Sequence, residues 1–158
     1  MNLWRCAVKI IGSCLLTGLC LLSTAVMAGE TPEDFFYRYT TLSNDFDPDV
    51  AKLYANSAEV RVFRMQAQRP RDALHMAGWQ WKRHLAKVLP DAQAENDRSE
   101  YENIEVTRVA RGYKIKADRY STLTCHTDRA YFMVISPDGS GSYAIEEEYA
   151  VIQVDSAC

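Results

Sequence analysis

Hydrophobic residues between positions 30 and 90 recur at intervals of three and four, which is the spacing of amphipathic helices. The pattern predicts helices over residues 32–43, 48–56 and 73–89. The first two begin with a threonine or an aspartate followed by proline, residue types favoured at the N-cap and at the first helical position. We expect the third helix to end before Pro90, because proline lacks the backbone donor that continues a helix.

Hydrophobic and polar residues alternate in a short stretch after the second helix and in most of the chain after residue 100, as they do in half-buried strands. Because the helices come first and the strands last, the predicted fold class is α+β. Three N-terminal helices would pack on a strongly curved antiparallel sheet. The predicted strands cover residues 59–65, 102–109, 113–125, 130–135 and 142–154, with turn-rich segments between the last four.

The first 28 residues have the order of regions found in a secretory signal. Arg5 and Lys9 precede an apolar run, and small residues lead up to Ala28. The alternative, a membrane anchor, needs about 20 apolar residues, and this run is barely that long and contains polar residues. The sequence therefore predicts a signal peptide over residues 1–28 and a single domain over residues 29–158. The mature protein would be periplasmic or secreted and would have no membrane span.

Removal of the signal changes both the charge and the cysteine content. It takes away two basic residues and no acid, which leaves 16 basic and 21 acidic residues and a net charge of −5. This charge argues against a nucleic-acid surface. Only Cys125 and Cys158 remain, and in an oxidising compartment they predict one disulfide. A buried free Cys125, or a bridge from Cys158 to a second chain, is the alternative. The histidines are scattered, so no metal site and no cofactor are expected.

The last predicted strand contains three consecutive glutamates, and strand periodicity singles out Glu147. Alternation places it on one face with Tyr143 and Tyr149, whereas Glu146 and Glu148 fall on the opposite face among small residues. A carboxylate on an aromatic face needs a partner, because unpaired burial costs several kcal/mol. We therefore expect Glu147 to recognise a ligand or to act as an acid or base, unless it is a rim residue paired with an arginine or a tyrosine.

The pocket should include residues from two further segments. In the register that groups the apolar residues, Phe132 lies opposite Ile145, on the face of Glu147. His75 and Trp79 lie four residues apart on the predicted third helix, next to Arg83, and form a ridge at its mouth. No residue is assigned a catalytic role. The predicted ligand-pocket residues are Glu147, Tyr149, Tyr143, Phe132, Trp79 and His75.

The order of these elements, together with the segment "FDPDVAKLYANSAEV" that runs to Val60, resembles the NTF2-like (SnoaL-like) superfamily. That resemblance implies a cone-shaped fold with an internal pocket. In isomerases of the superfamily, the strand after this segment carries an aspartate base, but here residues 59–63 have valine where the aspartate would fall. Dehydratases of the superfamily need a histidine and aspartate pair, for which His75 and Asp118 are the candidates.

Three classes of function fit these observations. The first, which the missing aspartate favours, is an exported non-catalytic module that binds a small apolar ligand or a protein partner through its concave pocket and sheet. The second is a lyase, isomerase or hydrolase acting on an apolar cyclic substrate. The third is an immunity-type inhibitor of a partner enzyme, in which an acidic edge meets a basic cleft. The sheet could also form a homodimer.

Overall fold

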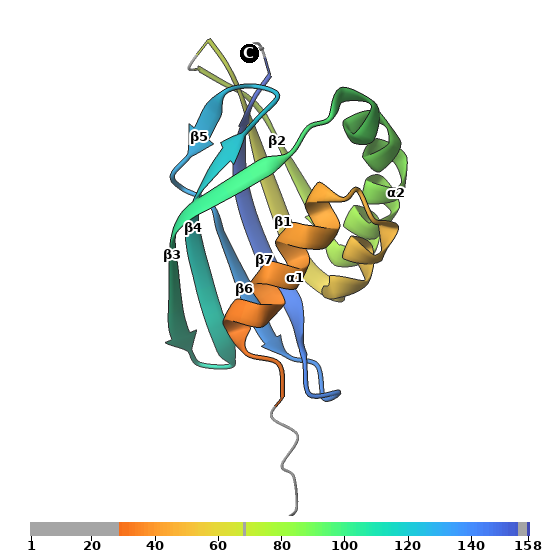
Figure 1. Cartoon of the computed structure of the whole chain (residues 1–158), viewed down its shortest axis with the longest axis vertical. Helices are drawn as coiled ribbons and strands as arrows, with labels where there is room; N and C mark the ends of the chain where they lie inside the picture. Colours follow the sequence, from red (N-terminus) through yellow and green to blue (C-terminus); the bar gives the residue numbers. More distant parts are fainter. Residues whose placement is uncertain (1–28, 68, 155–157) are drawn as a thin grey trace, which may run out of the picture.

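The computed structural model describes residues 29–67, 69–154 and 158, and the predicted signal lies outside this part of the chain. The predicted α+β class is confirmed, and the chain contains two strands that the sequence did not predict, over residues 69–77 and 126–128 (Figure 1). The helices are α1 (Pro32–Asn44), the 3₁₀ helix η1 (Pro48–Leu53) and α2 (Gly78–Glu95). The strands are β1 (Tyr54–Gln66), β2 (Arg69–Ala77), β3 (Ser99–Val109), β4 (Gly112–Ser121), β5 (His126–Asp128), β6 (Phe132–Pro137) and β7 (Tyr143–Gln153).

The strands form one strongly curved sheet in the order β2-β1-β7-β6-β4-β3, with β5 paired to β4 (Figure 1). All neighbouring strands are antiparallel except β1 and β7, which run parallel and make the sheet mixed. Helix α1 crosses the concave side of the sheet, and α2 lies beside β1 (Figure 1). The space between the helices and the concave face contains the core.

Helix α1 begins where the sequence predicts. The Thr31 side chain accepts a hydrogen bond from the Asp34 backbone N–H at 3.1 Å, and Pro32 occupies the first turn. The helix buries Phe35, Phe36 and Tyr39, which lie on one face at a spacing of one to four residues. This buried face directs α1 onto the sheet.

The predicted second and third helices are shorter or shifted in the structure. The second is only the 3₁₀ helix η1, and β1 begins at Tyr54 instead of at residue 59. The third begins at Gly78, because residues 69–77 form a strand whose Leu74 pairs with Val62 of β1. Pairing with β1 satisfies the backbone of this segment, so tertiary contacts override its helix-like spacing.

Helix α2 also continues beyond the predicted stop. It passes through Pro90 and ends at Glu95, where Asn96 adopts a left-handed conformation with φ of 52°. Proline has a fixed φ that is compatible with a helix, and its cost is one backbone hydrogen bond and some crowding. Asparagine tolerates the left-handed conformation better than most residues, which makes it a suitable helix end.

The two cysteines form an intrachain disulfide, as predicted. Cys125 and Cys158 are joined with their Cα atoms 5.4 Å apart and 33 residues apart in sequence. Closing a loop of this length in the unfolded chain stabilises a fold by about 3–4 kcal/mol in the chain-entropy model. The bridge therefore ties Cys158 to the loop between β4 and β5.

Gly78 allows α2 to approach β1 closely, and we expect Gly78→Ala to destabilise the protein by at least about 2 kcal/mol. An added Cβ would lie 1.9 Å from the Ala55 carbonyl oxygen and 2.9 Å from the Ala58 Cβ. Chemical denaturation would measure the loss. Ala86→Gly, on the exposed side of the same helix, should cost only about 1 kcal/mol. Equal losses for both variants would contradict this account of the contact.

Candidate functional site

The concave side of the sheet encloses a hollow of about 340 Å³, here called the cone hollow. It lies between the sheet and both α-helices, and Val62, Leu85 and Ile152 are among the residues that form its apolar wall. Its polar side chains come from several elements. They include Tyr39 from α1, Tyr54 from the start of β1, Tyr101 from β3, Arg119 from β4, Tyr131 from just before β6 and Glu148 from β7.

Glu148 is buried in this hollow and accepts three hydrogen bonds from tyrosine hydroxyls. Tyr39 donates to its Oε1 at 2.7 Å, Tyr131 donates to Oε1 at 3.0 Å, and Tyr54 donates to Oε2 at 2.5 Å. We call these three tyrosines the tyrosine cage. Hydrogen bonds to a charged acceptor are stronger than neutral ones, and they compensate for the loss of water around a buried carboxylate.

The cage hydroxyls hold their protons strongly. Burial raises the pKa of Tyr39, Tyr54 and Tyr131 well above the ordinary value, and the negative charge of Glu148 raises it further. Burial also raises the pKa of Tyr101, although the positive charge of Arg119 opposes this shift. Each hydroxyl therefore remains a donor throughout the neutral pH range.

Arg119 is the cationic group of the site. Its Nε donates to the Ser99 hydroxyl at 3.2 Å, and its side chain is half-buried. Burial acts to lower its pKa, but the neighbouring phenol groups and Glu148 outweigh burial and raise the pKa above the ordinary value. The arginine is therefore charged. In the described part of the chain it makes no ion pair.

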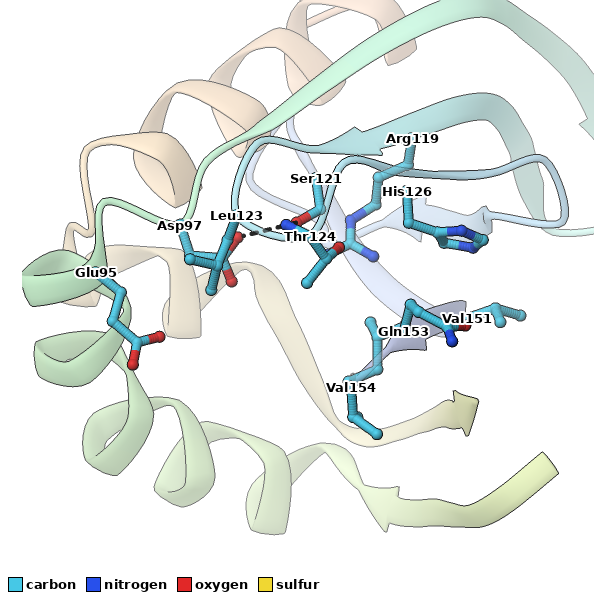
Figure 2. A pocket seen from close by; sticks show the side chains of 11 residues that line it. Glu95, Asp97, Arg119, Ser121, Leu123, Thr124, His126, Val151, Gln153 and Val154 are labelled. Atoms are coloured by element: carbon cyan, nitrogen blue, oxygen red, sulfur yellow. Dashed lines mark hydrogen bonds between the residues drawn. The ribbon is translucent and has the colours of Figure 1, made fainter. Parts of the chain in front are cut away.

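A second hollow, of about 560 Å³, lies where β4, β5 and β7 meet the segment after α2 (Figure 2). We call it the outer hollow. Arg119, Asp97 and Ile152 line both hollows, so the two meet at these residues. The Ser121 hydroxyl donates to Asp97 at 3.3 Å, and Figure 2 shows the Arg119 guanidinium between Ser121 and His126.

The structure places Glu148 in the cone hollow, and the predicted inward position of Glu147 is wrong. A β-bulge in β7 causes the difference, because Val134 of β6 pairs with Glu147 whereas the next residue, Ile135, pairs with Ile145. Glu146 is therefore extra, and the two faces of β7 exchange after it. Glu147 forms an ion pair with Arg61 of β1 on the convex face.

The predicted partners of Glu147 on β6 and β7 also lie outside the cone hollow. Phe132 and Tyr149 are opposite each other and stack on the convex face with ring centroids 5.4 Å apart. The predicted pairing of Phe132 with Ile145 is therefore wrong, because the turn between these strands is tighter than expected and the bulge shifts the register. Tyr143 does face inward, but it packs edge-on against Phe35, away from the hollow.

His75 and Trp79 do not form the predicted helical ridge. His75 belongs to β2, is largely exposed and lies 3.0 Å from Glu59, whereas Trp79 is in the first turn of α2 and is 50% exposed. Neither lines the cone hollow. Asp118 accepts a hydrogen bond from the side-chain amide of Asn103 at 2.8 Å, and His75 contacts Glu59 instead. The pair of His75 and Asp118 required for dehydratase chemistry is therefore not formed.

Strand alternation could have found Arg119 but not Glu148. Ile115 and Ala117 are inward residues of β4, and Arg119 continues their two-residue period to the end of the strand. No local signal marks the bulge that turns Glu148 inward. The tyrosine cage is also a long-range arrangement, since its members lie between 17 and 109 residues from Glu148 in sequence.

The described residues offer neither a metal site nor a membrane-spanning helix. They contain no group of three or more histidine, cysteine, aspartate or glutamate side chains placed to hold a metal ion. None of the helices within them combines the length and the apolar character needed to cross a membrane.

Comparison with known proteins identifies the fold. No protein-family model matches the sequence, and no curated protein matches it. An NTF2-like protein of unknown function from Pseudomonas putida KT2440 is similar in structure, with a TM-score of 0.56 and 13% identity over 74% of this chain and 80% of that chain. A protein assigned as a ketosteroid isomerase from Parabacteroides distasonis ATCC 8503 gives a TM-score of 0.53 and 10% identity over 80% and 92% of the two chains.

A third similar structure, assigned as a calcium/calmodulin-dependent protein kinase type II association domain from Thiobacillus denitrificans ATCC 25259, has a TM-score of 0.58 and 10% identity over 80% and 98% of the two chains. At such identities the similarity shows the fold alone. The predicted NTF2-like fold is therefore confirmed.

The two neighbouring glutamates should differ in their contribution to stability. We expect Glu148→Gln to lower the free energy of unfolding by about 1–3 kcal/mol, because an amide nitrogen cannot accept the cage hydrogen bonds. Glu147→Gln should cost less than about 1 kcal/mol, because its ion pair with Arg61 is partly exposed. Urea denaturation of both variants would measure this difference, and an equal loss would contradict the assignment of the two faces.

Alkaline titration should separate the four tyrosines that line the cone hollow from the other tyrosines. The pKa values of Tyr39, Tyr54, Tyr101 and Tyr131 are raised in the folded state, so the stability they contribute is complete below the unfolded value of about 10. It is lost as the pH rises from there through the folded-state values. The tyrosinate absorbance of these four side chains should therefore appear together with alkaline unfolding. Reversible ionisation of all nine tyrosines in the folded protein near pH 10 would refute the burial of these four side chains.

Proposed function

We propose that this domain is an exported, non-catalytic module that binds a small, largely apolar molecule in the cone hollow. The observation that carries this proposal is that Glu148, the buried carboxylate of a mainly apolar and aromatic hollow, is already hydrogen-bonded by the cage. Small-molecule sites have this composition, with apolar walls and few polar groups, and begin at about 300 Å³. The hollow is at the small end of that range.

The same arrangement favours binding over proton-transfer catalysis. A general base needs a lone pair within hydrogen-bond reach of the substrate proton. Oε1 of Glu148 accepts two hydrogen bonds and Oε2 accepts one, so most of the acceptor capacity of the carboxylate is used within the protein. On β1, the inward residues next to Glu148 are Val60 and Val62, which supply no acid or base.

Export is supported by two independent features. The order of charged, apolar and small residues in residues 1–28 is that of a secretory signal. The disulfide between Cys125 and Cys158 is a bond that persists mainly in oxidising compartments. A periplasmic or extracellular binding module accounts for both.

The neutral fluorescent probe N-phenyl-1-naphthylamine would test occupancy of the cone hollow. We expect saturable enhancement of its fluorescence with one site per chain. Ala150→Phe should abolish it, because Ala150 is a buried residue of the wall and the larger ring would fill the hollow. Ala144→Phe, the same substitution on β7 outside the hollow, is the matched control and should bind normally. Circular dichroism would establish that both variants fold.

Failure of the wild-type protein to bind the probe, or equal binding by the two phenylalanine variants, would contradict the proposed function.

A further inference from the structure

We propose that the natural ligand is an amphipathic organic anion, whose apolar body lies in the cone hollow and whose carboxylate or similar acidic group binds Arg119. This inference rests on the proposed function, since it specifies the chemical class of the molecule bound at the same site. We call Arg119 the anion anchor, because its guanidinium would bind the acidic group of the ligand.

The argument begins with the incomplete pairing of Arg119. Its Nε bonds to Ser99 and its side chain also interacts with the Tyr101 hydroxyl, but in the part of the chain that the structure describes no carboxylate lies within ion-pair distance of its guanidinium. Full burial of an unpaired charge costs several kcal/mol, and Arg119, which is half-buried, bears part of that cost. A bound acid would supply the missing partner, and the planar guanidinium can donate two parallel hydrogen bonds to it.

The position of Arg119 fixes where the acidic group would lie. The arginine is at the end of β4, and it lines the cone hollow and the outer hollow together. Figure 2 shows its guanidinium at the wall of the outer hollow. A ligand with its apolar part among the aromatic rings of the cone would therefore have its acidic group at the junction, with access to water through the outer hollow.

The two acidic residues of the cone hollow, Glu148 and Asp97, differ in their hydrogen bonding. Glu148 is deeper, and its charge is engaged by the cage hydroxyls. Asp97 lines both hollows and accepts only the Ser121 hydroxyl among the described side chains, so it would weaken the binding of an anion. Apart from the cage and Tyr101, the remaining titratable groups that line the two hollows are His84 in the cone hollow and Glu95 and His126 in the outer hollow.

Other ligand classes fit these groups less well. A cationic ligand would meet the unpaired charge of Arg119, and like charges repel strongly where water is excluded. A neutral apolar ligand would displace water from the hollow and would leave the charge of Arg119 without an acidic partner. The buried indole N–H of Trp81 lies in the cone hollow beside the Tyr54 hydroxyl and makes no hydrogen bond of normal geometry among the described residues, so it is a second donor for an acceptor-bearing ligand.

A matched pair of probes tests this inference. N-phenyl-1-naphthylamine is neutral, and 1-anilinonaphthalene-8-sulfonate has the same rings with an added sulfonate. We expect Arg119→Met to weaken binding of the sulfonate about tenfold or more, and to change binding of the neutral probe less than twofold. Arg119→Lys should retain part of the sulfonate affinity, because the charge remains. Asp97→Asn should strengthen sulfonate binding and leave the neutral probe unchanged.

Arg129→Met is the matched control, because Arg129 is exposed and lines neither hollow, and it should bind both probes like the wild type. Binding of the neutral probe also shows that the Arg119→Met variant keeps its hollow. If that variant binds both probes normally, or loses both equally, the anion anchor is refuted while the proposed function stands. If the wild-type protein binds neither probe, the proposed function itself fails.

Discussion

The need to satisfy a buried carboxylate is the constraint on which the rest of this structure depends. Glu148 lies on β7, in the middle of the sheet, and its partners come from α1, from the start of β1 and from the residue before β6. An unpaired carboxylate at this depth would cost several kcal/mol, so the helix and the strands must meet at one point. The cage thereby fixes how α1 crosses the sheet. Its hydrogen bonds also specify geometry in a way that apolar contacts of the surrounding core do not.

The bulge in β7 makes this arrangement possible, because it turns Glu148 inward and leaves Glu147 on the convex face. Before the bulge, Tyr143 and Ile145 face the helices. After it, Glu148 and Ala150 face them, and Glu147 joins Arg61 and the stacked rings of the convex face. One extra residue therefore exchanges the faces of the second half of the strand. The exposed pair on the convex face is worth little in stability, whereas the inward carboxylate organises the hollow.

Glu148 and Arg119, two of the charged groups that line the hollow, have different surroundings, and this difference supports the proposed binding function. The negative charge of Glu148 is surrounded by donors from its own chain, whereas the positive charge of Arg119 has no acidic partner among the described residues. A site prepared for proton transfer would leave the carboxylate open to substrate. Here the open charge is the arginine, at the junction with the outer hollow. This unequal pairing is the observation behind the proposed acidic ligand.

The sequence by itself determined the α+β class and most of the elements, because those follow from local patterns. Capping at Thr31 predicts α1, alternation predicts most of the strands, and the two cysteines left after the signal predict the disulfide. The motif that ends at Val60 also identified the fold. Periodicity was sufficient for most helices and strands because an element with one buried face leaves that pattern in the chain.

The tertiary structure alone decided which glutamate faces inward and where α2 begins. Residues 69–77 have a spacing that also suits a helix, but pairing with β1 makes them a strand. Simple alternation along β7 predicts that Glu147 faces inward, but the bulge makes Glu148 the inward residue. The cage unites side chains up to 109 residues apart, a distance at which local spacing carries no information. Each of these outcomes depends on pairing between distant segments, and that pairing is set by the packing of the whole domain.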